Sequence, residues 1–160
     1  MVVCYRTCNC EYQDDRVAGA IMGPVDAVHS AQARWYEEYG DTKMAEAFAL
    51  YFFERIAKPL FGDHGGPDEE RLKDLAENVT PVQLAYVESQ VPDSGFLFGA
   101  DLLIADIALV SPTVNAAYAG YEIDVSQFPK TTAFRERVLS HPSVAKVLEA
   151  ERAMIEAFNA

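Results

Sequence analysis

The sequence predicts an all-α fold, a bundle of five or six helices. No segment of the 160 residues alternates apolar and polar side chains with a period of two for long enough to form a sheet. Apolar side chains recur instead at intervals of three and four, which is the spacing of one face of a helix. Proline and glycine stand between these segments, where helices begin and end. With 50% hydrophobic residues, the chain is long enough to bury a core of its own.

The first part of the chain differs from the rest. Residues 1–25 have no sustained periodicity and end in a run that contains Gly23 and Pro24. We therefore expect an irregular N-terminal tail there. Helical patterns fill residues 26–160, which we expect to form one helical domain.

All three cysteines, Cys4, Cys8 and Cys10, lie in this tail. An odd number of cysteines at one end of a chain is not a disulfide framework for a domain of this size. Their C-x3-C-x-C spacing offers three soft metal ligands, but no further Cys or His follows at the spacing of a fourth ligand. We predict reduced thiols and no metal site, and keep a metal bound by the three cysteines as the alternative.

The first helix is expected to be long. Residues 26–61 contain no proline before Pro59 and a single glycine, Gly40. Asp26 has the side chain of an N-cap, and Pro59 with Gly62 ends the pattern. Gly40 predicts a bend or an irregular turn within the helix.

This helix carries apolar side chains on two opposite sides. One side gathers Trp35, Tyr39, Ala49, Phe53 and Ile56, and the other gathers Tyr36, Met44, Ala47, Phe48 and Tyr51. A helix at the edge of a bundle needs one such stripe, so the second stripe predicts contact with another chain, another domain or a ligand. The alternative is that the helix lies at the centre of its own bundle.

A second helical pattern follows a polar loop over residues 62–67. Its apolar side chains step by 3, 4, 3 and 4 and are Leu72, Leu75, Val79, Val82 and Tyr86. Pro81 falls within this stripe, and Thr80 and Gln83 have the spacing of a capping box. We therefore expect the helix to kink or restart at Thr80.

Three further helices complete the predicted bundle. Residues 104–119 are apolar nearly all round, which indicates a helix at the centre of the fold. Pro129 opens a helix to about residue 139, and Pro142 opens the last helix. The apolar face of the last helix holds Val144, Val147, Leu148, Met154, Ile155 and Phe158.

The charge of the chain excludes some partners. A net charge of −12 repels a phosphate backbone and an anionic membrane surface, so we expect neither nucleic acid nor a membrane as partner. The longest apolar stretch, residues 47–53, is far shorter than the roughly 20 residues that span a bilayer. The sequence also shows no secretory signal. A cytoplasmic protein is expected.

A capping pattern marks the start of the predicted central helix. If Leu103 is the N-cap, Asp106 stands at the third helical position, where its carboxylate accepts a hydrogen bond from the N–H of Leu103. Leu102 and Ile107 then have the spacing of a hydrophobic staple. We assign Asp106 a structural role in capping rather than a catalytic one. Leucine at the N-cap has no side-chain acceptor, so half of the capping box is missing.

Several segments, taken in order, resemble one known family. They are residues 33–42 (ARWYEEYGDT), 56–62 (IAKPLFG), 96–99 (FLFG), 102–108 (LLIADIA) and 128–144. In the last segment, Phe128-Pro129 and His141-Pro142 each stand at the start of a predicted helix. Over about residues 26–157 the chain resembles the C-terminal all-helical domain of soluble glutathione transferases. That family usually has Ser or Thr where this chain has Leu103.

The resemblance implies an activity and a missing part. In this family a separate N-terminal thioredoxin-like domain holds glutathione and supplies the group that activates its thiol, and such a domain needs roughly 80 residues. Only residues 1–25 precede Asp26, and we do not expect them to form a thioredoxin-like domain, so the sequence predicts a truncated transferase. It would conjugate glutathione, as co-substrate, to small hydrophobic electrophiles only if that half is supplied. We assign no catalytic residue and no other cofactor.

The resemblance also implies where a hydrophobic substrate would lie. The family lines its pocket partly with the long first helix, which also pairs across a dimer. Our candidates are Met44, Phe48 and Tyr51 on the second stripe, and Tyr118 in the central helix, with packing in the core or an interface as the alternative for each. The expected partners are a second copy in a homodimer, or a thioredoxin-like domain. The other functions to weigh are a non-catalytic docking module and a carrier of small hydrophobic molecules.

Overall fold

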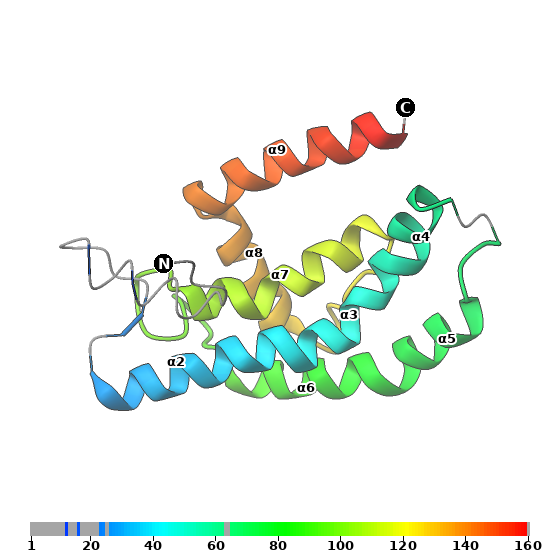
Figure 1. Ribbon diagram of the computed structural model, residues 1–160. Coiled ribbons are helices and arrows are strands. Elements are labelled where there is room, and N and C mark those ends of the chain that lie inside the picture. The colour runs from blue at the N-terminus through cyan, green and yellow to red at the C-terminus, as the bar shows by residue number, and fades with distance from the viewer. Residues whose placement is uncertain (1–11, 13–15, 17–22, 25, 63–64, 160) are drawn as a thin grey trace.

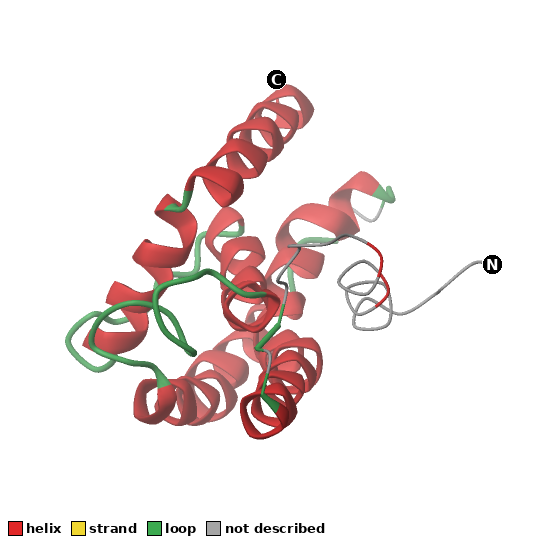
Figure 2. Cartoon of the chain, turned by 90° about the vertical axis from the view of Figure 1, so that its left-hand side faces the viewer, coloured by secondary structure: helices red, strands yellow, loops and turns green. Residues whose placement is uncertain are grey.

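The computed structural model describes residues 12, 16, 23–24, 26–62 and 65–159. Its helices form five continuous stretches, and the described part has no strand, only a single bridge between Phe96 and Gly99. The predicted all-α bundle is confirmed, and Figure 2 shows it from the side. Cys4, Cys8 and Cys10 lie outside the described residues. Expectations for the tail and its thiols therefore stay predictions.

The long first helix is interrupted by two π-helical turns. It consists of α2 (Ala27–Tyr39), η1 (Gly40–Met44), α3 (Ala45–Phe52), η2 (Phe53–Ala57) and α4 (Lys58–Leu60). As expected, Asp26 is the N-cap, and its Oδ1 accepts from the N–H of His29 at 3.0 Å. The helix ends before Gly62, which has a φ of 86°.

Gly40 begins the first π turn, at a point where the neighbouring helix leaves no room for a side chain. A Cβ at residue 40 would collide with the carbonyl group of Ala108. Pro112, four residues after Ala108 in the central helix, has no N–H to donate to that carbonyl. The glycine therefore lets the backbone of the first helix cover a carbonyl that lacks its helical partner. The irregular turn predicted at Gly40 is confirmed.

The structure decides between the two apolar stripes of the first helix. Met44, Ala47, Phe48 and Tyr51, from the second stripe, are all buried in the core. The first stripe is mixed: Tyr39 is buried, Ile56 is half-buried, and Ala49, Trp35 and Phe53 are exposed. The second stripe, which was predicted to contact a ligand or a partner, is thus the side that packs against the rest of this chain.

The second helix runs antiparallel to the first along the lower face in Figure 1. It consists of α5 (Glu69–Asp74), η3 (Leu75–Val79) and α6 (Thr80–Gln90). The expected irregularity near Pro81 is present as the π turn η3. The expected capping box is not, because Thr80 is fully buried and its hydroxyl donates to the carbonyl of Ala47 at 3.2 Å. Thr80 ties the two helices together instead.

The last three helices complete the bundle. α7 (Ile104–Tyr118) is packed against α2, η1, α3 and α8, which confirms its predicted central place. α8 (Pro129–Ser140) contacts α6 and α7, and α9 (Pro142–Asn159) is packed against α8. In Figure 1, α9 extends along the top of the molecule toward α4. Among the described residues, none of the helices has the length and apolarity that crossing a bilayer requires.

Arg137 of α8 fixes the loop between α6 and α7. Its Nε donates to the carbonyl of Gly95 at 3.0 Å, Nη1 to Asp93 at 3.3 Å and Nη2 to Pro92 at 2.7 Å. These three carbonyl groups lie in the loop after α6, where no helix supplies donors, and the guanidinium donates to them instead. The loop that leads into α7 is therefore held from a helix more than 40 residues away in sequence.

Candidate functional site

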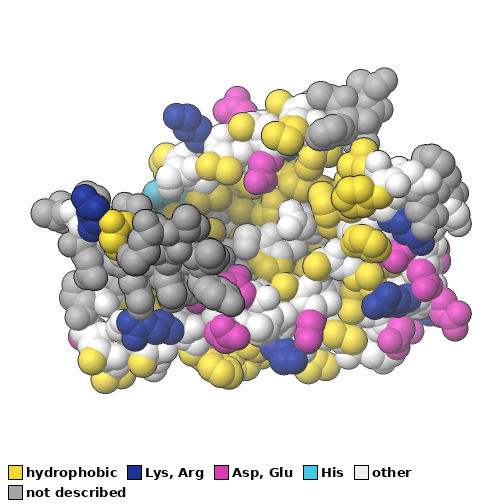
Figure 3. All heavy atoms as spheres, viewed as in Figure 1, with side chains coloured by type: hydrophobic (Ala, Val, Ile, Leu, Met, Phe, Trp, Pro, Cys, Tyr) yellow, Lys and Arg dark blue, Asp and Glu magenta, His cyan; other side chains and the backbone are white. Residues whose placement is uncertain are grey.

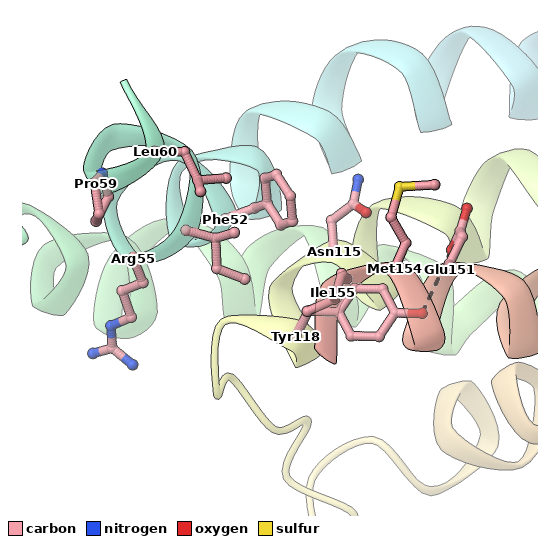
Figure 4. Close-up of a pocket in the computed structure, with 10 residues that line it drawn as sticks. Phe52, Arg55, Pro59, Leu60, Asn115, Tyr118, Glu151, Met154 and Ile155 are labelled. Carbon is pink, nitrogen blue, oxygen red and sulfur yellow. Dashed lines mark hydrogen bonds between the residues drawn. The ribbon is translucent and has the colours of Figure 1, made fainter. Parts of the chain in front are cut away.

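A cavity of about 440 Å³ lies where three helices converge (Figure 4). Its walls come from the end of the first helix, the end of α7 and the second half of α9. The lining residues are Phe52, Arg55, Ile56, Pro59, Leu60, Asn115, Tyr118, Glu151, Met154 and Ile155. This volume is in the range of pockets that hold small organic molecules.

The walls of this cavity are mostly apolar, and the apolar surface continues outside it. Leu60 and Met154 are 56% and 61% exposed, and the adjacent Phe61 is 84% exposed. In Figure 3, hydrophobic side chains fill the hollow between α9 and the helices below it. Exposed apolar side chains that gather around a cavity mark a site for a hydrophobic ligand or partner.

A hydrogen bond across the cavity joins α7 to α9. The hydroxyl of Tyr118 donates to Oε2 of Glu151 at 3.5 Å (Figure 4). Burial raises the pKa of Tyr118, and the charge of Glu151 acts in the same direction while Arg152 opposes it. The phenol therefore stays protonated at neutral pH and acts as a hydrogen-bond donor.

Arg55 stands at the edge of the cavity and is already engaged. Its Nη1 donates to the carbonyl of Ala119 at 3.1 Å, and its Nη2 pairs with Oε2 of Glu69 at 3.2 Å. These contacts hold the end of α7 and the start of α5 to the first helix. The remaining polar group of the lining, the amide of Asn115, lies on α7 facing the cavity in Figure 4.

The structure brings only one of the four predicted pocket residues to this cavity. Tyr118 lines it, whereas Met44, Phe48 and Tyr51 do not. Met44 and Phe48 have no exposed surface and Tyr51 is 4% exposed. Met44, Phe48 and Tyr51 therefore belong to the core, which was the alternative to lining a substrate pocket. The assignment of Tyr118 to a substrate stays a prediction.

Sequence reasoning missed most of the cavity because its walls come from three separate segments. Phe52 follows directly after Tyr51 on the same helix and lines the cavity, whereas Tyr51 is buried in the core. Ile56 belongs to the other stripe. Met154 and Ile155 were expected on an apolar face of the last helix, but no local signal shows that this face lies opposite the first helix.

Asp106 has the predicted place at the start of α7. Its Oδ2 accepts from the N–H of Leu103 at 2.8 Å, and the carboxylate is completely buried. Burial raises the pKa of Asp106, while hydrogen bonds from backbone N–H groups act in the opposite direction. Leu103, the N-cap, makes no side-chain hydrogen bond, so the capping box is half present, as expected. Leu102 and Ile107 are half-buried, and their contact as a staple stays a prediction.

The polar chemistry of the cavity is limited to a few groups. Within the part of the chain that the structure describes, no group of His, Cys, Asp and Glu has the arrangement of a metal site. The cavity offers apolar walls, a guanidinium, an amide, and a phenol that is hydrogen-bonded to a carboxylate.

A known protein family matches the sequence of this chain, and solved structures match its fold. Residues 51–151 match the family described as "Glutathione S-transferase, C-terminal domain". No curated protein sequence matches the chain.

Solved structures of similar fold include glutathione S-transferases. A glutathione S-transferase-I bound with lactoylglutathione is 20% identical over 92% of this chain and 69% of its own, with a TM-score of 0.75. A glutathione S-transferase from Sinorhizobium meliloti 1021 is 25% identical over 91% of this chain and 66% of its own, with a TM-score of 0.74. FzlA from C. crescentus is 20% identical over 93% of this chain and 65% of its own, with a TM-score of 0.75.

The chain spans about two thirds of the length of these structures. Each of these likenesses covers more than 90% of this chain. The family match covers more than half of the chain, from the middle of the first helix to the second half of α9. This chain belongs to the glutathione S-transferase C-terminal domain family.

Proposed function

We propose that this chain is the substrate-binding half of a glutathione transferase. The cavity between the first helix, α7 and α9 would hold a small hydrophobic electrophile, and conjugation to glutathione would require a thioredoxin-like half. The observation that carries the proposal is the apolar cavity of about 440 Å³, with Tyr118 and Glu151 across it. We place this activity in the cytoplasm.

The need for a second half follows from the chemistry. A transferase must stabilise the thiolate of glutathione, which requires a hydrogen-bond donor or a positive charge at the sulfur. The phenol of Tyr118 donates to Glu151, and the Arg55 guanidinium is engaged with Ala119 and Glu69. The cavity would therefore bind the electrophile, but its phenol and its guanidinium are already engaged and do not activate the thiol of glutathione.

A chimaera tests whether conjugation requires a thioredoxin-like half in addition to this chain. The thioredoxin-like domain of the Sinorhizobium meliloti glutathione S-transferase would be fused before residue 26, and conjugation of glutathione to an aryl halide followed by absorbance. We expect no turnover by the 160-residue chain and measurable turnover by the chimaera. Turnover by the chain alone, or none by a folded chimaera with bound glutathione, would contradict the proposal.

A substitution within the cavity tests where the electrophile lies. Ile56→Trp fills the cavity from the first helix, whereas Val28→Trp adds the same bulk at a side chain that is 67% exposed on α2. We expect I56W to lower the binding of an apolar fluorescent dye, and the kcat/KM of the chimaera, by at least about tenfold, which is the effect of losing roughly 1.4 kcal/mol. V28W should change neither by more than about twofold.

A non-catalytic docking module is the second candidate, because the first helix keeps exposed aromatic side chains. Trp35 is 55% exposed and Phe53 is 48% exposed, on helical stretches that otherwise pack inward. Such a surface suits a second copy in a homodimer or another domain. Gel filtration separates these cases: a Trp35→Glu variant that turns a dimer into a monomer supports pairing through this helix, and a wild-type monomer argues against it.

A further inference from the structure

A second cavity, of about 320 Å³, lies on another side of α7, away from the site described above. Its walls come from α7, from α8 and from the segment of residues 121–125 between them. The lining residues are Thr113, Ala117, Tyr121, Glu122, Ile123, Val125, Thr132 and Arg135. The cavity therefore combines the apolar side chains of Ile123 and Val125 with the guanidinium of Arg135 on α8.

Arg135 enters this cavity with most of its hydrogen-bonding capacity unused. Its Nε donates to Oγ1 of Thr113 at 2.9 Å. The Thr113 hydroxyl is buried and donates its own proton to the carbonyl of Val110 at 2.7 Å, so its oxygen is oriented to accept from Arg135. A guanidinium has five N–H donors. Within the described part of the chain, its terminal Nη1 and Nη2 groups make no hydrogen bond and no ion pair.

Arg137, on the same helix, contrasts with Arg135 because its guanidinium is fully used in structural hydrogen bonds. All three of its nitrogens donate to backbone carbonyls. Arg135, two residues earlier, is half-buried and is fixed through Nε alone. A half-buried guanidinium whose Nη groups have no acceptor is costly in free energy unless a ligand or water completes it.

The surroundings of Arg135 define the charge of such a ligand. Burial lowers the pKa of Arg135, Arg152 acts in the same direction, and Glu136 opposes both. Glu122 also lines the cavity, but no carboxylate of the described residues lies within 4.0 Å of the guanidinium. One unpaired cation beside a carboxylate favours a monoanion, since a dianion would meet Glu122 with only one positive charge to balance it.

We propose that this cavity binds a small organic carboxylate. Its anionic group would pair with the two Nη groups of Arg135 in the two-pronged geometry that guanidinium and carboxylate share. Its apolar part would lie against Ile123 and Val125. The site is separate from the transferase cavity and does not depend on the thioredoxin-like half.

Calorimetric titration of the full chain with benzoate, benzamide and inorganic phosphate tests this. Benzoate has the required charge and apolar body, benzamide has the same shape without charge, and phosphate has charge without the apolar body. We expect saturable binding of benzoate that weakens with salt, and binding of benzamide and phosphate at least about tenfold weaker.

Three variants locate the site. Arg135→Gln should weaken benzoate binding at least about tenfold, and Glu122→Gln should strengthen it several-fold at low salt because it removes a nearby negative charge. Lys146→Gln is the matched control: it removes one exposed positive charge on α9 outside this cavity and should change the affinity by less than about twofold.

Equal affinity for benzoate and benzamide, equal losses in R135Q and K146Q, or no saturable binding by the wild type would each overturn the proposal. If R135Q fails to fold, as judged by circular dichroism, the affinities of the wild type and of E122Q for the three ligands still test the proposal. An E122Q variant that binds benzoate no better than the wild type, with phosphate as the preferred ligand, would also contradict it.

Discussion

The backbone N–H of Leu97 donates to Oδ1 of Asp106 at 2.8 Å. The other oxygen of the same carboxylate accepts from Leu103 at 2.8 Å, so one buried side chain joins the loop before α7 to the first turn of that helix. The 96–99 segment closes on itself through paired hydrogen bonds between Phe96 and Gly99. Asp106 thus does more than cap a helix, because it also fixes the position of this loop over the start of α7.

Asp106→Asn should destabilise the protein, because an amide offers one acceptor oxygen where the carboxylate offers two. One of the two N–H donors, on Leu97 or Leu103, would then face an NH2 group in the interior. A buried donor without an acceptor costs about 1–3 kcal/mol. We expect the free energy of unfolding, measured in urea, to fall by that amount, and to fall further in Asp106→Ala.

Asp101→Asn is the control for this prediction, because Asp101 is an exposed carboxylate just before the same helix. Its substitution should change the free energy of unfolding by less than about 0.5 kcal/mol. Equal stability of D106N and D101N would show that the double contact of Asp106 contributes nothing.

Gly40→Ala should destabilise the protein although alanine is the better helix former. In an open helix this change stabilises by about 1 kcal/mol. Here the added methyl group would collide with the carbonyl of Ala108, and the two helices must separate to admit it. Overpacking of this kind costs about 1–3 kcal/mol, which we expect to see as a net loss in thermal and urea unfolding. Thr42→Ala, at an exposed position of the same turn, should stay within about 0.5 kcal/mol of the wild type.

Most of the fold could be predicted from where its helices begin and end. Asp26, Pro59, Pro129 and Pro142 mark boundaries that the structure has within a few residues. Inside the first helix the prediction was weaker, because apolar side chains occur on both sides and periodicity alone does not say which side meets α7. Two π turns further change the register of the helix, which a regular 3.6-residue pattern does not describe.

The cavity could not be predicted for a different reason. Its walls combine Ile56, Asn115 and Ile155, from segments that are distant in the sequence. Each of these side chains has an ordinary local environment, and the chemistry appears only when the three helices converge. The same holds for the second contact of Asp106 and for Arg135, whose significance depends on a cavity that no local pattern reveals.

The carboxylate of Glu88, on α6, caps the start of α8. It accepts from the backbone N–H of Lys130 at 2.9 Å and from the N–H and the hydroxyl of Thr131, both at 2.7 Å. Phe128, the N-cap of α8, makes no side-chain hydrogen bond. A side chain from another helix therefore does the work of an N-cap residue, and also holds α6 to α8.

Glu88→Gln should lower the stability of the protein in a pH-dependent way. Burial alone would raise the pKa of Glu88, but the hydrogen bonds from Thr131 and Lys130 outweigh it, and the pKa is lowered from 4.5. For an acid with a lowered pKa, the stabilisation is present above about 4.5 and is lost as the pH falls through the lower value in the folded protein. We expect E88Q to lose about 0.5–2 kcal/mol at pH 7, as for other lost caps, and the difference from the wild type to shrink below about pH 4.5. Urea unfolding at pH 7, 5 and about 3.5 measures this. A difference that stays constant across that range would show that the ionised carboxylate is not what caps α8.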